Sequence, residues 1–364
     1  MRALRIYAGP VALAHVRRNG LQPTDVGIIP GAAGGPKGLI LGPLDRFVFG
    51  EWLPRGGHAV DLVGASIGAW RMATACLDDA VAAFERLERD YIAQDYVVEP
   101  GRQRPTPAHV SAAFAANLQA FFGGRLSQIL HHPRYRVHIV TARGRHVLGH
   151  EGRWRTPIGY AGAFLANALR RRAMGAWLER VVFSVPEAGS TTGGAAPLPF
   201  DPADYRTRQV ALREDNFMPA LQASCSIPFV LQAVHHIPGA PPGAYWDGGI
   251  TDYHLHLRWR ADRGLVLYPH FQRHVIPGWL DKGLRWRHKP TAALERTIVL
   301  APDPDWVRRL PNGKLPDRTD FPRYGHRLSE RMRAWQTAVR EAQRLADEFA
   351  AWLERPDPAR VEPL

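Results

Sequence analysis

A strand, a sharp turn and a helix follow one another at residues 59–77, and the turn reads Gly64-Ala65-Ser66-Ile67-Gly68. Residues 59–63, apolar except for Asp61, predict a buried strand, and residues 69–77 predict a helix. So sharp a turn leaves no room for side chains two residues either side of the serine, which accounts for both glycines. The helix would direct its N-terminal amides and the positive end of its dipole at Ser66. This pattern is typical of a strained turn that exposes a nucleophilic serine hydroxyl.

The remainder of the chain alternates between strand-like and helix-like segments. This alternation predicts an α/β fold with a mostly parallel sheet. Further strand-like runs lie at 26–30, 47–53, 136–140, 181–185, 264–268 and 297–300, and helical patterns lie at 80–91, 108–122, 158–177 and 217–225. The Pro- and Gly-rich stretches 186–202 and 238–243 are expected to be surface loops.

The composition changes at about residue 302. A Pro-rich stretch, expected to be extended, runs to 322, and a long helix with one apolar stripe follows. We therefore predict a catalytic domain over 1–301 and a segment 302–364 packed on that domain. The helix would lay its stripe on the sheet or on a partner subunit, or lie in a membrane interface. The stripe consists of Leu328, Met332, Trp335, Val339, Ala342, Leu345, Phe349 and Trp352.

Charge and cysteine content limit the partners and the compartment. The chain has 364 residues, a formal net charge of +13 and two cysteines, Cys76 and Cys225, too few for a disulfide framework. Without an uninterrupted apolar leader or an 18-residue apolar run, a cytoplasmic protein, at most peripheral at a membrane, is expected. The positive charge would attract the protein to anionic phospholipid surfaces. Alternatively, it indicates only an arginine-rich surface that is solvated. Nucleic acid is an unlikely partner, because no nucleic-acid-binding motif accompanies the charge.

A glycine-rich loop, Gly-Ala-Ala-Gly-Gly-Pro-Lys-Gly at 31–38, follows the first predicted strand. It is not a Walker A loop, since Pro36 precedes the lysine and Gly38 stands where Ser or Thr would hold magnesium. Nor does it contain the G-x-G-x-x-G spacing of dinucleotide-binding folds. Its backbone amides can form an anion nest, with donors at Gly34, Gly35 and Lys37 but not at Pro36. Beside a nucleophilic serine, that anion would be the oxyanion of a tetrahedral intermediate.

A third motif is Tyr245-Trp246-Asp247-Gly248-Gly249. Asp-Gly-Gly at a strand end is commonly only a turn. Here it follows residues 221–230, a run of small residues that leads to Pro228. The order of the motifs is therefore a glycine-rich loop with a lysine, G-x-S-x-G, A-S-x-x-x-P and D-G-G.

Over residues 26–252 this order resembles the patatin-like phospholipase family. The resemblance implies a three-layer α/β sandwich and a serine lipid acyl hydrolase of phospholipase A, lysophospholipase or esterase type, without cofactor or metal. It implies Ser66 as nucleophile, Asp247 as general base and Gly34, Gly35 and Lys37 as the oxyanion loop. The remaining motif glycines are Gly38, Gly64, Gly68, Gly248 and Gly249. The chain departs from the family's usual Asp-Gly-Gly-Gly, because it reads Ala32-Ala33-Gly34-Gly35.

A carboxylate base is chemically unusual, since its ordinary pKa near 3.9 makes it weak in water. A dry pocket and an apolar neighbour such as Trp246 would raise that pKa. Ser66 would then attack an acyl ester to give an acyl-enzyme, and Asp247 would help water to hydrolyse it. The same acyl-enzyme could instead transfer its acyl group to an alcohol.

Three alternatives follow from other residues. A Ser-His-Asp triad would use a late histidine such as His270, His274, His288 or His326, although no H-G-G-G-type loop is present. Asp252, His254 and His256 alternate along one predicted strand and could ligate a metal. A non-catalytic basic module would bind anionic membranes or nucleic acid and hydrolyse nothing.

Substrate choice depends on the walls of the pocket. Phospholipids, lysophospholipids, acylglycerols, thioesters and simple esters all offer the same carbonyl to Ser66. We expect the walls to come from residues 121–177 and from the C-terminal helix. Expected partners are a lipid or acyl-ester substrate, an anionic membrane in peripheral contact, and a second copy bound through the C-terminal helix.

Overall fold

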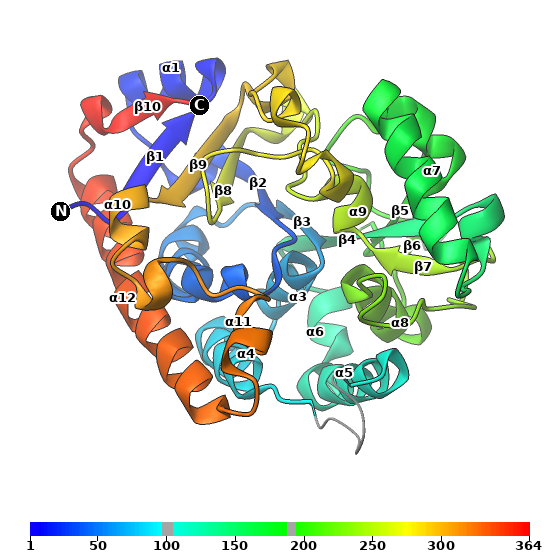
Figure 1. The fold of residues 1–364 in the computed structure, drawn as a ribbon. Helices are drawn as coiled ribbons and strands as arrows, with labels where there is room; N and C mark the ends of the chain where they lie inside the picture. The colour runs from blue at the N-terminus through cyan, green and yellow to red at the C-terminus, as the bar shows by residue number, and fades with distance from the viewer. Residues whose placement is uncertain (97–104, 188–193) are drawn as a thin grey trace.

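A mixed sheet crosses the molecule (Figure 1), and the computed structural model describes residues 1–96, 105–187 and 194–364. Within these residues the strand order is β10-β1-β9-β8-β2-β3-β4-β5-β6, and β7 pairs with β4. The strands are β1 (Leu4–Ala8), β2 (Val26–Gly31), β3 (Val60–Ala65), β4 (Tyr135–Gly144), β5 (Leu178–Ser184), β6 (Thr207–Ala211), β7 (Tyr245–Asp247), β8 (Leu265–Pro269), β9 (Thr297–Pro302) and β10 (Val361–Pro363).

The centre of the sheet is parallel. From β9 through β8, β2 and β3 to β4, each strand pairs in parallel with the next. The pairs β5–β6 and β1–β10 are also parallel. Antiparallel pairing joins β1 to β9 and joins β4 to both β5 and β7. The predicted α/β class with a mostly parallel sheet is confirmed.

Helices occupy the connections between the strands. They are α1 (Pro10–Asn19), α2 (Gly42–Phe47), α3 (Ile67–Thr74), α4 (Ala80–Ala93), α5 (Pro107–Phe122), α6 (Leu126–Leu130), α7 (Arg155–Leu169), α8 (Glu214–Cys225), α9 (Gly249–Asp252), α10 (Pro304–Val307), α11 (Asp320–Tyr324) and α12 (Leu328–Glu354). None of the helices in the described ranges is both long and apolar enough to cross a membrane.

Two apolar layers enclose the sheet, and alternate residues of β3 point into them. Leu62 joins the large core that includes Leu44 of α2 and Leu221 of α8. Val63 points the other way, into a smaller core with Leu255 and Val266. This alternation is the two-residue period of a strand buried on both faces. The sheet is thus the middle layer of a sandwich, as predicted.

The apolar stripe of α12 is buried against the chain itself. From Trp335 to Trp352 its members are at most a few per cent exposed, and Leu328 and Met332 at the start are half-buried. Phe349 packs edge-on against Phe47 and Trp52. The stripe therefore packs on its own chain, while β10 from the same C-terminal segment extends the sheet beside β1. The domain boundary between residues 301 and 302 stays a prediction, as does a homo-oligomer formed through the C-terminal helix.

Residues 47–53 form no strand, so that prediction was wrong. Helix α2 ends at Phe47, and a π-helical turn, Val48–Trp52, continues it. A segment this short, even when most of its residues are apolar, does not show by periodicity whether it is a strand or a helix. The stretch 302–322 is likewise not simply extended, since it contains α10 and the start of α11. Part of the loop predicted at 186–202 lies outside the described residues.

Close packing of α3 on the sheet explains the glycines of its turn. A Cβ at Gly68 would lie 1.9 Å from the carbonyl oxygen of Gly31 in β2, and a Cβ at Gly64 would lie 2.3 Å from the Cα of Ala69. Both neighbours are backbone atoms of packed elements, so they cannot move aside cheaply. Helix α3 therefore approaches β2 and β3 more closely than any side chain at these positions would allow.

We predict that Gly68→Ala lowers the free energy of unfolding by about 3 kcal/mol or more, because the new methyl group must push α3 away from β2. Urea denaturation of the purified protein measures the change. Gly283→Ala is the matched control, since a Cβ there would meet no atom within 4 Å. Equal stability of the two variants would contradict the close packing.

Candidate active site

Ser66 lies between the end of β3 and the start of α3, in a strained backbone conformation. Its φ of 56° and ψ of −131° fall where non-glycine residues are rare and where the strain costs about 1–3 kcal/mol. The side chain is 4% exposed, and Oγ donates a hydrogen bond of 2.6 Å to Oδ2 of Asp247. The strained turn thus directs the hydroxyl at a carboxylate 181 positions away in the sequence.

Strand β4 brings these two residues together. In its register Val140 lies opposite Ala65 of β3, and the next residue, Thr141, lies opposite Asp247 of β7. The serine and the aspartate therefore emerge at the same level on either side of one strand. The amide of Gly249 donates to the other carboxylate oxygen, Oδ1, at 2.7 Å. Asp247 is held at both oxygens.

The C-terminal end of α8 holds the backbone of both residues through hydrogen bonds. Oγ of Ser224 accepts a hydrogen bond from the amide of Ser66 at 3.0 Å and donates to the carbonyl of Val140 at 2.7 Å. The amide of Asp247 donates to the carbonyl of Ser226 at 2.8 Å. The segment of small residues before Pro228 therefore positions the turn and the aspartate together. Its composition marked this segment in the sequence, although Ser224 was not singled out.

Burial dominates the electrostatics of Asp247. It raises the pKa of the carboxyl above its ordinary value, while the hydroxyl of Ser66, the charge of Arg318 and the amide of Gly249 offset part of the increase. The net shift is upward. A carboxylate with a raised pKa is a stronger base than one in water, and it already accepts the hydrogen bond of the serine.

The glycine-rich loop begins a 3₁₀ helix, Gly35–Leu41. Gly35 has a φ of 56°, which glycine adopts without strain, and a Cβ at Gly34 would lie 2.5 Å from the ring of Phe271. Within the described part of the chain, no acceptor engages the amide of Gly34 or of Gly35. Both amides are therefore available to a ligand.

A cavity of about 200 Å³ opens over Ser66. Its lining includes Gly34, Lys37, Asp247 and Gly249 of the predicted site, but not Gly35. The other motif glycines serve packing: Gly38 lies against Ile67, and a Cβ at Gly248 would lie 2.0 Å from the carbonyl oxygen of Val140. The remaining lining residues are Ala33, Ile227, Pro228, Ile250, Tyr253, Trp279, Lys282, Asp317, Arg318 and Thr319.

A family model described as patatin-like phospholipase matches residues 33–254. The chain belongs to the patatin-like phospholipase family. Membership indicates lipid acyl hydrolase activity. Among solved structures, VipD from Legionella pneumophila is similar at 13% sequence identity with a TM-score of 0.37, covering 95% of this chain and 70% of VipD. No curated protein matches the chain.

The walls of the cavity in this patatin-like protein differ from those predicted. They come from residues 227–228, 249–253, 279–282 and 317–319, rather than from 121–177 or α12. Trp279, Lys282 and Arg318 lie beyond the range of the family match and carry no motif. Their position depends on how loops fold back over the sheet, which local sequence patterns do not encode.

Three cations, Lys37, Lys282 and Arg318, line this cavity together with the carboxylates of Asp247 and Asp317. Nζ of Lys37 lies 5.3 Å from the ring centre of Phe271, and Nζ of Lys282 lies 5.0 Å from that of Tyr253. Across the described ranges, neither lysine nor Arg318 forms an ion pair, whereas Asp317 beside them pairs with Lys314 at 2.6 Å. Burial lowers the pKa of both lysines; the carboxylate of Asp317 offsets part of this shift, and the positive charge of Arg318 adds to it. The cavity is therefore an anion-attracting one.

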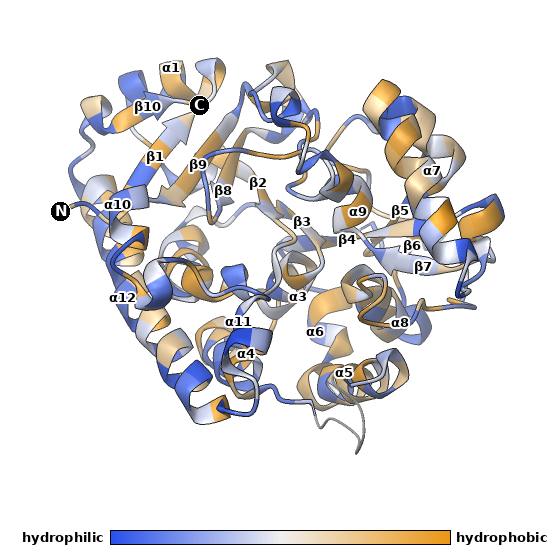
Figure 2. Cartoon of the chain, in the orientation of Figure 1, coloured by the Kyte–Doolittle hydropathy of each residue, from blue (hydrophilic) through white to orange (hydrophobic). Residues whose placement is uncertain are grey.

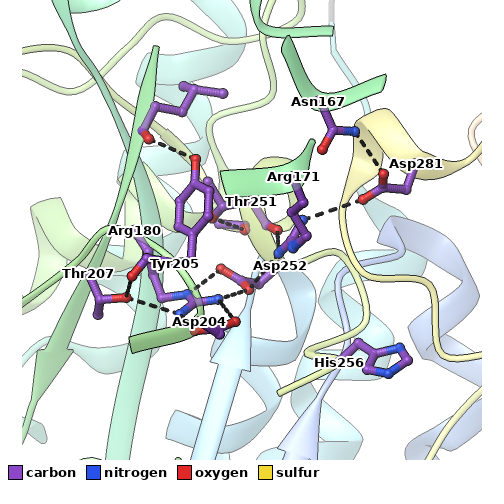
Figure 3. A network of polar contacts seen from close by, with 12 residues as sticks. Asn167, Arg171, Arg180, Asp204, Tyr205, Thr207, Thr251, Asp252, His256 and Asp281 are labelled. Carbon is purple, nitrogen blue, oxygen red and sulfur yellow. Dashed lines mark hydrogen bonds and ion pairs between the residues drawn. The ribbon is translucent and has the colours of Figure 1, made fainter. Parts of the chain in front are cut away.

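A buried ionic network stands behind the cavity wall (Figure 3). Arg180, fully buried, donates to both oxygens of Asp252 at 2.7 and 2.6 Å and also to Asp204. Arg171 contacts Asp252 and Asp281 at 3.3 and 3.4 Å, and Asn167 of α7 donates to Asp281 at 2.7 Å. The network thus ties α7, α9 and residues 279–281 together.

The network includes Asp252, one of the three residues that the sequence suggested as metal ligands. Asp252 is bound by arginines, and His254 and His256 contact backbone carbonyls through Nδ1. Burial alone would raise the pKa of Asp252, but Arg180 outweighs it and holds the pKa below its ordinary value. No group of three or more His, Cys, Asp or Glu side chains suited to a metal occurs among the residues that the structure describes.

Histidine does not line the cavity within the described ranges. His270, one of the late histidines considered for a triad, is buried beside His254 and contacts the carbonyl of Gln272. Burial lowers its pKa to about 3. His288 contacts the carbonyl of Asp281, outside the cavity lining.

We predict that the stability of the wild-type protein falls relative to Asp247→Asn as the pH rises. The folded state holds the proton of Asp247 more tightly than the unfolded chain, because burial raises the pKa. Folding is therefore favoured below the ordinary pKa of 3.8, and the cost of the buried charge is complete above the raised value. Urea unfolding of both proteins across this range measures the difference, and a difference independent of pH would contradict the raised pKa.

Proposed function

We propose that this protein is a serine hydrolase of lipid acyl esters, in which Ser66 is the nucleophile and Asp247 the general base. The observation that carries the proposal is the hydrogen bond of 2.6 Å from Ser66 Oγ to a buried carboxylate in a cavity. The carboxylate contacts the hydroxyl directly, so no imidazole is needed between them. Family membership supplies the class of substrate.

In acylation, Ser66 Oγ bonds to the ester carbonyl carbon while its proton passes to Oδ2 of Asp247. The carbonyl oxygen becomes an oxyanion, which the amides of Gly34 and Gly35 would receive. Collapse of this intermediate breaks the ester C–O bond, and the leaving alkoxide takes the proton from Asp247. The acyl group remains on Ser66.

Deacylation repeats these steps with water. Asp247 accepts a proton from the water molecule as its oxygen bonds to the acyl carbon, and a second oxyanion forms in the same place. Its collapse breaks the bond to Ser66 Oγ, which recovers the proton from Asp247. The products are a free fatty acid and the original site.

The cavity favours an ester that also carries an anionic group. Lys37, Lys282 and Arg318 bring three positive charges to it without ion-pair partners in the described part of the chain. A phosphate or carboxylate near the scissile ester would compensate them, and a partly desolvated site strengthens that attraction. We therefore propose phospholipids and lysophospholipids ahead of neutral acylglycerols.

Ser66→Ala should abolish ester hydrolysis and labelling by a fluorophosphonate, and Asp247→Asn should reduce kcat by roughly 10³-fold or more, because each removes one partner of the proton transfer. Hydrolysis of a p-nitrophenyl ester and gel detection of the label measure the two effects. Ser127→Ala, an exposed serine of α6, is the matched control and should retain full activity. Undiminished turnover by Ser66→Ala would overturn the assignment.

Arg318→Gln should shift the acidic limb of kcat/KM to higher pH. The arginine holds the pKa of Asp247 down, so its loss raises that pKa, and the carboxylate is then protonated at a higher pH. The same variant should hydrolyse an anionic lysophospholipid roughly tenfold more slowly, with little change for a neutral ester.

Arg323→Gln, on an exposed arginine of α11, provides the control for a general loss of charge. It should leave both the pH profile and the substrate preference unchanged. An unshifted acidic limb in Arg318→Gln, or equal loss on both esters, would remove the role proposed for this side chain.

A further inference from the structure

Helix α7 leaves the apolar side chains of its outer face in contact with solvent. Trp154, Ile158, Leu165 and Leu169 are 71%, 60%, 64% and 88% exposed. Their spacing of four, seven and four residues places them on one stripe of a helix. Gly159, Tyr160, Ala163 and Asn167 on the opposite face are buried. Figure 2 shows apolar colouring along α7, which stands at the opposite edge of the molecule from α12.

A second exposed apolar segment lies at the rim of the cavity, beside α7. Ile227 and Pro228 line the cavity, and the next two residues, Phe229 and Val230, are 59% and 46% exposed. Phe229 has a φ of 68°, a strained conformation that places an aromatic ring at the surface. Its ring centre lies 6.1 Å from that of Tyr160 on α7. Phe229 therefore packs beside the inner face of α7, and the exposed apolar residues of the helix and of the cavity rim lie on neighbouring elements.

Positive charge surrounds the stripe. Residues 152–178 contain five arginines and no aspartate or glutamate. Arg153 and Arg155 at the start of α7, and Arg170 and Arg172 beyond its end, are exposed. An exposed apolar stripe between arginines matches an interface of acyl chains and anionic headgroups.

We propose that α7, together with Phe229 and Val230, is the surface by which this protein docks on an anionic lipid bilayer. The proposal deepens the proposed function and rests on it for the identity of the ligand. A cavity of about 200 Å³ is smaller than the roughly 300–1,000 Å³ of sites that enclose a small-molecule ligand. Most of a long-chain lipid must therefore stay outside, and the apolar surface at the mouth is where its chains would lie.

The surface is not the C-terminal helix, for which the sequence left a membrane-interface position open as an alternative to packing. The stripe of α12 is buried against α2 and its neighbours, so it has no apolar face to offer to a bilayer. Helix α7 differs, because its large aliphatic residues Ile158, Leu165 and Leu169 face outward.

Flotation with vesicles tests the proposal in the Ser66→Ala background, where lipid turnover does not affect binding. The protein should float with vesicles of phosphatidylcholine and phosphatidylglycerol and much less with pure phosphatidylcholine. Trp154→Ser/Leu165→Ser/Leu169→Ser should weaken binding roughly tenfold or more, and Arg153→Gln/Arg170→Gln should weaken binding to the anionic vesicles alone. These side chains are exposed, so the fold is retained.

Val11→Ser/Arg17→Gln/Arg18→Gln is the matched control, since it removes exposed apolar and basic side chains from α1 instead. It should float like the parent protein. Unchanged flotation of the α7 variant, or no flotation of the parent, overturns the proposal. A dimer in light scattering that the α7 substitutions dissociate also overturns it, in favour of a second copy on this surface.

Hydrolysis of a water-soluble ester, measured in the Ser66-containing proteins, separates this proposal from the proposed function. The α7 variant should retain that activity while losing activity on anionic vesicles. Loss of both activities without loss of flotation would overturn the docking surface, whereas flotation by a protein inactive on every ester would leave docking intact and overturn only the hydrolase.

Discussion

The hydrogen bond between Ser66 and Asp247 depends on the register of one strand, β4. Several packing contacts of the fold keep that register fixed. Strand β4 pairs in parallel with β3 and antiparallel with β7, so it presents the serine and the carboxylate on its two sides at adjacent positions of its register. A slip of one residue in either pairing would turn one of the two side chains to the other face of the sheet. The close approach of α3 at Gly68 and the hydroxyl of Ser224 both act against such a slip.

The two partners of this bond are each kept in an unfavourable state. Ser66 occupies a strained backbone conformation, and Asp247 is a carboxyl whose ionised form is disfavoured by burial. Neither condition stabilises the fold, and packing of α3 and α8 around them has to compensate. The same conditions direct the hydroxyl at the carboxylate and raise the pKa of that carboxyl, which supports the proposal that a carboxylate takes the place usually held by an imidazole.

Residues at turns were predictable from the sequence, and residues brought in by long-range folding were not. Glycines at 64 and 68 signal a tight turn by their chemistry, and Asp247 stood out because Gly248 and Gly249 follow it. Lys282 and Arg318 stand in loops without periodicity, so nothing local indicated that they would meet at the cavity. The helical turn at 48–52 was wrongly predicted to be a strand because so few residues do not distinguish the period of a strand from that of a helix.

The ionic network behind the cavity constrains how this site could diversify. Arg180, Asp252 and Asp281 are fully buried, so replacing one alone would leave a charge in the interior without its counterpart. Substitution in this wall is therefore tolerated only when an acidic residue and its basic partner are replaced together. At the rim, Lys282 and Arg318 form no ion pair with any residue that the structure describes. Under the proposed function, related chains would be expected to differ in headgroup preference through the rim, while the inner wall stays the same.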